Sequence, residues 1–506
     1  MTVSTDGVST GSNSAAGTLL PGFEGTELPE WLRVRLSDGL AGVCLFATNI
    51  ASPSQLRRLT DAIRRANPRA VIAIDEEGGD VTRLFQAVGS PYPGAAILGR
   101  LDDLQYTREI GERVGRQLRA VGVTLDFAPD ADINSSDDNP VIGTRSFGAD
   151  PELVARHTTA WVEGLQSTGV AASAKHFPGH GDTASDSHLS LPVIDLPLAT
   201  LRSRELVPFA AAIAAGTATI MTSHILLPQL DEVPATFSTR ILGELLRGGL
   251  GFTGVIVSDA LDMHGASGSA GIPDAAVRAL AAGCDLLCIG TANTDAQLGE
   301  IEAAVAAAVS DGRLPSSRLA DARARVTALG AAGAAGVAVA SPVEPVESEP
   351  VESEPVETEP SYSLDRTITA FDISGTAPTP LEARTLVQLD TAANIAVGSA
   401  PWGAAAAGAP VLQLGDGDAL PSADRQLVLI GRDNHRRDWT RAAIDAARAR
   451  DPRTLVVDMG WPSADRRYAD VATFGASRHA GQALLRWLEH STGSTGSSGS
   501  TSEGTT

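Results

Sequence analysis

The sequence has few cysteines and no long apolar run. Cys44, Cys284 and Cys288 are the only cysteines in 506 residues, too few and too oddly placed for a disulfide framework or a four-thiolate metal site. Each lies in an apolar run, which favours buried thiols. No stretch approaches the ~20 apolar residues of a membrane span, and the Ser/Thr/Gly-rich start lacks the features of a signal peptide. We therefore expect a reduced, cytoplasmic protein.

Aromatic residues and positive charge are also scarce. Aromatics make up 4% of a chain that is 43% hydrophobic, so the core must consist mainly of aliphatic side chains, as in helix-covered parallel sheets. The formal net charge of −22 argues against electrostatic binding to nucleic acid or to an anionic membrane. Glutamates in residues 344–359, a segment without Lys or Arg, carry seven of the negative charges. The acidity therefore says little about the substrate.

A proline-rich segment divides the chain. Residues 341–361 repeat PVESE-like units with a proline every five residues, a composition that cannot bury a core. We expect an extended, semi-rigid linker between an N-terminal body, residues 18–340, and a smaller C-terminal body, residues 362–490. The Ser/Thr/Gly-rich ends, residues 1–17 and 491–506, are expected to be disordered.

The N-terminal body alternates short apolar runs with long helical stretches, which indicates βαβ units and a parallel sheet. The apolar runs are Thr18–Pro21, Val43–Ala47, Val71–Asp75, Val123–Phe127, Val170–Lys175, Thr219–Ser223, Val255–Asp259 and Cys284–Ile289. Eight strands close a (β/α)8 TIM barrel, so the predicted fold class is α/β, with a barrel followed by a smaller domain. An open doubly wound sheet is the competing architecture, disfavoured because a Gly-rich phosphate-binding fingerprint is missing.

The C-terminal body reads as a small open α/β sandwich. Strand-like runs cover residues 394–398, 426–431 and 454–459, and helical stretches cover 439–450 and 478–490. Because this body offers no obvious catalytic pair, we expect it to pack on the barrel or to mediate dimerisation. The alternative is that it contributes to a substrate cleft.

The densest polar feature is the stretch KHFPGHGDTASDSH, residues 175–188. Asp186 and His188 lie two residues apart, so the carboxylate can orient the imidazole for general acid/base catalysis. A solvated surface loop is one alternative and a metal site is another, although no spacing matches a structural zinc pattern. The metal ligands would come from His176, His180, Asp182, Asp186 and His188.

A second candidate group is the carboxylate of Asp259, which ends the apolar run VIVSD. It is either a structural partner for a cation or a nucleophile. Barrel enzymes carry their chemistry at the carboxyl ends of the strands, so Asp259 and the 175–188 stretch should meet at one mouth. A carboxylate and a general acid there give the two-group arrangement of a retaining glycosidase.

Three further groups of polar residues suit sugar hydroxyls, which need rigidly held donors and acceptors. They are DEEGG at 75–79 with Arg83, GTRSFG at 143–148 with Arg145, and the pair Lys175 and His176. The alternative for each is a salt bridge on the barrel rim. We favour that alternative for Glu76 and Glu77, one of which we expect to face solvent.

The ordered set IDEEGGDVTR, NPVIGTRSFGADP, KHFPGHGDTASDSH and VIVSDALDM resembles glycoside hydrolase family 3, in its bacterial β-N-acetylglucosaminidase (β-hexosaminidase) branch. The resemblance spans about residues 18–340, and the C-terminal body is similar to the α/β sandwich domain that many members carry. It implies a TIM barrel, a small-molecule carbohydrate substrate, no metal and no organic cofactor. It leaves the oligomeric state open.

The resemblance also implies roles for individual residues. Asp259 would be the nucleophile and His188 the acid/base, with Asp186 as its partner. The residues that would bind the non-reducing N-acetylglucosamine are Asp75, Arg83, Arg145, Lys175 and His176. Asp80 stands where the family usually has an arginine, which puts that arginine's local ion pair in doubt.

The activity that the resemblance implies is removal of terminal β-linked N-acetylglucosamine from muropeptides or chitin-type fragments, often in cytoplasmic peptidoglycan recycling. Phosphorolysis is an alternative reaction, because a neutral histidine does not repel an incoming phosphate as a glutamate would. A non-catalytic sugar-binding barrel is a third interpretation. It is disfavoured because both Asp259 and His188 are present.

Overall fold

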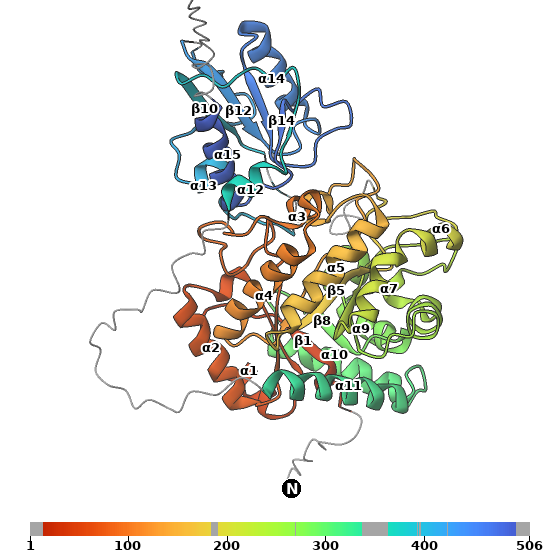
Figure 1. Ribbon diagram of the computed structural model, residues 1–506. Helices are drawn as coiled ribbons and strands as arrows, with labels where there is room; N and C mark the ends of the chain where they lie inside the picture. Colours follow the sequence, from red (N-terminus) through yellow and green to blue (C-terminus); the bar gives the residue numbers. More distant parts are fainter. Residues whose placement is uncertain are drawn as a thin grey trace, which may run out of the picture.

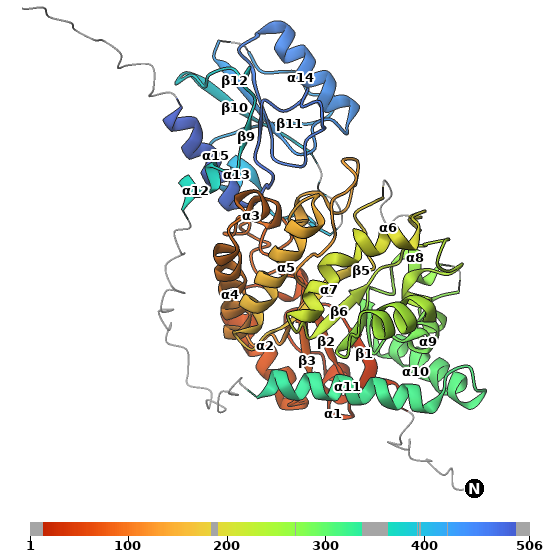
Figure 2. The same cartoon turned by 45° about the vertical axis from the view of Figure 1, so that its right-hand side comes forward.

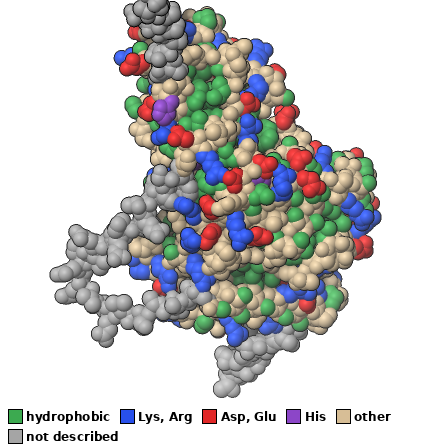
Figure 3. Space-filling view, viewed as in Figure 1, with side chains coloured by type: hydrophobic (Ala, Val, Ile, Leu, Met, Phe, Trp, Pro, Cys, Tyr) green, Lys and Arg blue, Asp and Glu red, His purple; other side chains and the backbone are tan. Residues whose placement is uncertain are grey.

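The computed structural model describes residues 14–183, 191–268, 270–335, 363–391, 393, 396–422 and 424–491. The predicted linker, residues 341–361, lies outside these ranges, as do residues 1–13 and 492–506 of the predicted tails. Within the described residues, none of the helices combines the length and the apolar character that crossing a membrane requires. In the face seen in Figure 3, basic and acidic side chains are interspersed, so the negative charge is not gathered there.

The N-terminal body is a barrel of parallel strands surrounded by helices (Figure 1). Its strands are β1 (Leu19–Pro21), β2 (Gly42–Leu45), β3 (Val71–Ile74), β4 (Leu125–Asp126), β5 (Ala171–Phe177), β6 (Thr219–Thr222), β7 (Val255–Ser258) and β8 (Leu286–Gly290). Each overlaps one of the eight predicted runs. The spatial order is sequential, β1-β8-β7-β6-β5-β4-β3-β2, and Ala41 N donates to Ala16 O (2.9 Å) beside the starts of β1 and β2. The predicted TIM barrel is confirmed, since a doubly wound sheet reverses its strand order partway.

The helices of this body are α1 (Glu30–Ser37), α2 (Pro53–Ala66), α3 (Ala95–Leu101), α4 (Leu104–Ala120), α5 (Pro151–Gln166), α6 (Leu198–Ser203), α7 (Leu206–Ala214), the π-type η5 (Arg240–Gly249), α8 (His264–Ser267), α9 (Ile272–Ala282), α10 (Asp295–Ser310) and α11 (Ser316–Ala334). Local sequence fixes where several begin. Asp150 accepts from Leu153 N (2.7 Å) and Pro151 occupies the first turn of α5, two signals that favour a helix start.

The C-terminal body is a mixed sheet with helices on its faces. Its strands, in spatial order, are β11 (Leu412–Leu414), β10 (Arg384–Leu389), β12 (Gln426–Gly431), β13 (Leu455–Asp458), β14 (Val471–Ala472) and β9 (Asp372–Ile373). Only the β14–β9 pair among these is antiparallel. The helices are α12 (Leu364–Ile368), α13 (Gly403–Ala406), α14 (Asp438–Arg450) and α15 (Arg478–His490).

The predicted strands at 426–431 and 454–459 and both predicted helices of this body are confirmed. The predicted strand at 394–398 is wrong, because residues 396–399 form a turn. The strand that the sequence did not reveal is β10, next to the edge strand β11. Its first three residues are only half-buried, so its apolar pattern is weak in the sequence.

The C-terminal body packs directly on the barrel, against the loops that follow β3 and β4 and against α3 (Figures 1 and 2). Ile97 of α3 is buried in the core of the C-terminal body. Arg100 Nε donates to Ala370 O (2.6 Å), and Arg436 Nη2 donates to Asn139 O (2.7 Å). These contacts combine buried apolar surface with satisfied backbone carbonyls, so the two bodies share one continuous interface.

Candidate active site

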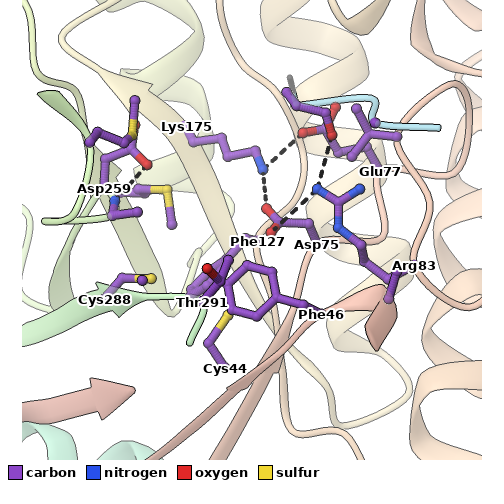
Figure 4. Close-up of a pocket in the computed structure, with 18 of the residues that line it drawn as sticks. Cys44, Phe46, Asp75, Glu77, Arg83, Phe127, Lys175, Asp259, Cys288 and Thr291 are labelled. Atoms are coloured by element: carbon purple, nitrogen blue, oxygen red, sulfur yellow. Dashed lines mark hydrogen bonds and ion pairs between the residues drawn. The ribbon is translucent and has the colours of Figure 1, made fainter. Parts of the chain in front are cut away.

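A cavity of about 520 Å³ opens at the mouth of the barrel (Figure 4). The predicted site residues that line it are Asp75, Arg83, Arg145, Lys175, His176 and Asp259. They converge because parallel strands end at the same side of a barrel. The predicted pair Asp186 and His188 lies outside the described residues.

Lys175, on β5, is the centre of a buried ion network. Its Nζ lies 2.8 Å from Asp75 Oδ1 and 2.8 Å from Glu77 Oε1. Burial disfavours the ammonium, but these two carboxylates outweigh that effect and raise the pKa of Lys175. The lysine therefore stays charged and keeps the Asp75 carboxylate, which is partly exposed to the cavity, in a fixed position.

Glu77 joins this network to Arg145, which ends the short turn η3 (Gly143–Arg145). Arg145 donates to both carboxylate oxygens of Glu77, from Nε (2.9 Å) and from Nη2 (2.8 Å). Burial raises the pKa of Glu77, but Arg145 and Lys175 outweigh it and hold the pKa below its usual value. Glu77 is 8% exposed. The predicted salt bridge exists, but it forms inside the cavity wall.

Glu76 is fully buried, so the expectation that Glu76 or Glu77 faces solvent is wrong. Its Oε2 accepts from Thr82 Oγ1, Arg83 N and Leu84 N, each at 2.9 Å. The carboxylate satisfies backbone donors that the tight loop would otherwise leave unpaired. Burial nevertheless raises the pKa of Glu76 to about 7. This side chain shapes the loop that presents Arg83.

His176 is held by Asp132, a residue that the sequence reasoning missed. His176 Nδ1 lies 2.7 Å from Asp132 Oδ2, and Asp132 Oδ1 also accepts from His180 N (2.6 Å). Burial lowers the pKa of His176 to about 4, so its ring is neutral at neutral pH. With the Nδ1 proton directed at Asp132, Nε2 is the hydrogen-bond acceptor of the ring. The signal that could have found Asp132 is the DxD pattern that follows β4.

His180 and Asp182, both in the loop after β5, separate in the structure. The His180 ring lines the cavity, and no described residue hydrogen-bonds to either of its nitrogens. Burial lowers the pKa of His180 to about 4 as well. Asp182 instead pairs with Arg204 outside the cavity lining (2.5 Å). The His180 ring thus faces the cavity, where it can contact a bound molecule.

Asp259 faces this network from the end of β7 (Figure 4). Its Oδ1 accepts from Ala260 N (2.8 Å). The side chain is half-buried and lines the cavity, so it can reach a bound ligand. A carboxylate on one wall and a cluster of fixed cations and acceptors on another can hold a polar molecule between them.

The C-terminal body supplies part of the cavity wall. Ala396, Gly398 and Ser399 line the cavity, and Arg83 Nη2 donates to Ala396 O (2.9 Å). The same guanidinium lies 4.0 Å from Asp75 Oδ2. The expected packing of this body on the barrel is therefore confirmed, and the body also lines the cavity, as the disfavoured alternative required. Small residues that act through backbone atoms carry no recognisable sequence signal.

Asp80 has a clear structural role. Its Oδ2 accepts from Thr144 Oγ1 (2.9 Å), beside Arg145, and its Oδ1 accepts from Ala476 N (2.8 Å) in the C-terminal body. The carboxylate therefore bridges the two loops of the barrel mouth and the second body. An arginine could accept neither hydrogen bond.

One group in the site brings three possible metal-ligand atoms close together. Asp130, Asp132 and His176 each offer a ligand atom, and these atoms lie within 4.8 Å of one another. Arg145 Nη2 already lies 3.5 Å from Asp130 Oδ2, and burial together with the neighbouring Asp132 raises the pKa of Asp130 to about 8. A guanidinium and a protonated carboxyl thus balance the charge of this group.

Comparison with known proteins agrees with the fold. Residues 26–329 match the family model "Glycosyl hydrolase family 3 N terminal domain". A TIM barrel whose mouth holds a cavity with charged side chains in its wall, together with this match, defines a glycoside hydrolase. The chain belongs to glycoside hydrolase family 3.

Three relatives illustrate the similarity. The beta-hexosaminidase of Stenotrophomonas maltophilia (strain K279a) is 40% identical over 282 residues, which are 54% of this chain and 82% of that protein. A family 3 beta-N-acetylglucosaminidase from Paenibacillus sp. str. FPU-7 superposes with a TM-score of 0.82 at 29% identity, covering 95% of this chain and 96% of that one. NagZ from Neisseria gonorrhoeae, solved with N-trifluoroacetyl-D-glucosamine, gives a TM-score of 0.50 at 32% identity. The superposition covers 62% of this chain and 98% of that one. The Paenibacillus enzyme is thus similar across both bodies.

Proposed function

We propose that the protein is a retaining exo-β-N-acetylglucosaminidase that removes terminal N-acetylglucosamine from β-linked glycosides such as muropeptide or chitin-type fragments. The observation that carries the proposal is the cavity in which Asp259 faces the network of Lys175, Asp75 and Arg145. The names of the relatives support N-acetylglucosamine as the sugar that is removed, since they include beta-hexosaminidases and beta-N-acetylglucosaminidases.

The fixed charges suit a neutral, hydroxyl-rich ligand. Lys175 is held by two carboxylates at 2.8 Å, so it donates to a sugar hydroxyl without any reorganisation on binding. Asp75 and the Nε2 nitrogen of His176 can accept hydrogen bonds from sugar hydroxyls, and Arg83 can donate hydrogen bonds to them. Donors and acceptors that are already oriented bind a sugar at low entropic cost.

In the proposed reaction Asp259 attacks the anomeric carbon while the bond to the leaving oxygen breaks. His188, oriented by Asp186, gives its proton to that oxygen. A water molecule then attacks the glycosyl-enzyme, its proton returns to His188, and Asp259 is released, so the configuration is retained. Both members of this pair lie outside the described residues, but the base of their loop is anchored, because Asn139 Nδ2 donates to His180 O and Gly181 O (2.9 Å each).

The test uses an aryl β-N-acetylglucosaminide and the Asp259→Asn variant. Loss of the nucleophile should lower kcat by at least about 10³-fold, within the range seen for catalytic groups. Asp262→Asn is the matched control, since this second carboxylate lines the same cavity three residues later. Equal activity of both variants and the native chain would contradict the role of Asp259. A sugar 1-phosphate as the main product in phosphate buffer would identify a phosphorylase instead.

A further inference from the structure

The loop between β4 and α5, residues 127–150, connects the C-terminal body with the wall of the cavity. The loop reaches from the barrel towards the C-terminal body (Figure 2). Two of its backbone carbonyls, Asp137 O (3.0 Å) and Asn139 O (2.7 Å), accept from Arg436 Nη2 of that body. The same loop carries Arg145, which lines the cavity. Arg436 is not among the described residues that line the cavity, so any effect that it has on the site passes through this loop.

Arg436 is presented by an anchored turn between β12 and α14. Asp458, at the end of β13, accepts from Asp433 N (2.8 Å) and from Asn434 N (3.0 Å). Arg436 N donates to Asp433 O (2.9 Å) within the turn. The Arg436 side chain is 20% exposed, so it is mostly enclosed between the two bodies. A planar guanidinium held in this way can keep two carbonyls at fixed positions.

Asn139 links this contact to the loop that follows β5. Its side chain is buried, at 1% exposure. Its Oδ1 accepts from Val141 N (2.9 Å) and Ile142 N (2.8 Å). Its Nδ2 donates to His180 O and Gly181 O (2.9 Å each). These bonds use both the donor and the acceptor side of the amide, so the side chain cannot shift without breaking some of them.

The loop after β5 is fitted to the β4–α5 loop at residues 180 and 181. Asp132 Oδ1 accepts from His180 N (2.6 Å). Gly181 lies so close to the β4–α5 loop that a Cβ at this position would overlap Ile133 O. The backbone of residues 180 and 181 must therefore follow the β4–α5 loop when that loop moves. The proposed acid/base residue, His188, comes a few positions later in the chain.

We propose that Arg436 is a positioning residue, through which the C-terminal body fixes the point where the acid/base loop leaves the barrel. The path runs from Arg436 to the carbonyl of Asn139, and from the amide of Asn139 to the backbone of residues 180 and 181. A general acid must lie within hydrogen-bond distance of the leaving oxygen. A displacement of ~1 Å at the base of its loop can therefore slow proton transfer by up to about 100-fold. The inference rests on the proposed function, because it assigns Arg436 to protonation of the leaving group.

The first experiment measures kcat/KM of Arg436→Met on two aryl β-N-acetylglucosaminides. Methionine keeps an apolar stem at the interface and loses the donors to the two carbonyls. Dinitrophenolate departs without a proton, whereas the phenyl glycoside depends on the general acid. We expect kcat/KM for the phenyl glycoside to fall at least about tenfold and that for the dinitrophenyl glycoside to change less than about twofold. A purely structural loss lowers both values equally, because it reduces the amount of active protein.

Two further variants test the path. Arg100→Met is the matched control, since Arg100 also donates to a backbone carbonyl across the interface, Ala370 O (2.6 Å), but from α3. It should leave the ratio of the two kcat/KM values unchanged. Asn139→Asp keeps the acceptor oxygen and loses the donors to residues 180 and 181, so it should reproduce the selective loss. Combining it with Arg436→Met should add little, because both changes break one path.

The second experiment needs no activity. Backbone amide hydrogen exchange in residues 176–183 should be faster in Arg436→Met than in the native chain, and unchanged in Arg100→Met. Unchanged exchange in Arg436→Met, or equal losses for the two glycosides, would overturn the positioning role. A native chain that hydrolyses neither glycoside would refute the proposed function, whereas faster exchange in Arg436→Met would still establish the path from Arg436 to residue 180.

Discussion

Replacing Glu77 by glutamine tests whether the buried ion network holds the cavity in shape. Glu77 accepts from Arg145 at 2.9 and 2.8 Å and from Lys175 at 2.8 Å. The variant leaves two buried cations with less negative charge between them. Removing one partner of a buried pair costs about 3–5 kcal/mol, because the remaining charge is left desolvated and unpaired. We expect the free energy of unfolding to fall by about that amount, and KM to rise as Arg145 and Lys175 lose their fixed positions.

The chain provides a matched control on its surface. Glu163 pairs with Arg108 at 2.9 Å, but these side chains are 42% and 54% exposed. Exposed ion pairs contribute about 0–1 kcal/mol, so Glu163→Gln should be nearly neutral. Urea unfolding followed by circular dichroism gives both values. If the free energy of unfolding falls no more in Glu77→Gln than in Glu163→Gln, burial does not determine how much each ion pair contributes to stability.

The same variant predicts a pH effect. The folded-state pKa of Glu77 lies below its usual value of 4.5, so the unfolded state binds the proton more readily. The stabilisation that ionised Glu77 gives the folded state is complete above the usual pKa of 4.5 and is lost as the pH falls towards the folded-state pKa. Acid unfolding of Glu77→Gln should therefore depend less steeply on pH below about 4.5 than that of the native chain.

Two further predictions concern the loops around the cavity. Asp80→Ala removes the hydrogen-bond acceptor for Thr144 and Ala476. We therefore expect the free energy of unfolding to fall by about 1–3 kcal/mol and proteolysis between the two bodies to become faster. A variant as protease-resistant as the native chain would show that Asp80 does not hold the bodies together. The pKa of His180 is lowered to about 4 by burial, so the native state resists protonation and loses stability as the pH falls from about 6.5 to 4. His180→Gln should remove up to about 3 kcal/mol of that loss in the free energy of unfolding, which urea unfolding at pH 6.5 and at pH 4 measures; an unchanged loss would contradict the prediction.

The sequence by itself determined the local elements. Apolar runs such as Val71–Ile74 and Val255–Ser258 are buried on both faces, so their continuous hydrophobicity marks strands of a parallel sheet. Their number and regular alternation with helices predict the barrel. The convergence of Asp75, Lys175 and Asp259 then follows from topology, because the carboxyl ends of barrel strands share one mouth. Strand β10 was missed, and the turn at 396–399 was mistaken for part of a strand, since half-buried strand residues and turns carry little periodicity.

Only the tertiary structure decided which distant groups meet. Asp80 and Ala476 are 396 positions apart, Arg83 and Ala396 are 313 apart, and the second partner in each case is a backbone atom that any residue would supply. Burial likewise depends on the whole fold, and it is burial that turns Glu77 from a rim carboxylate into the link between Lys175 and Arg145 in an ion network. Local pattern encodes the elements, whereas charge state, cavity shape and partner choice arise from packing.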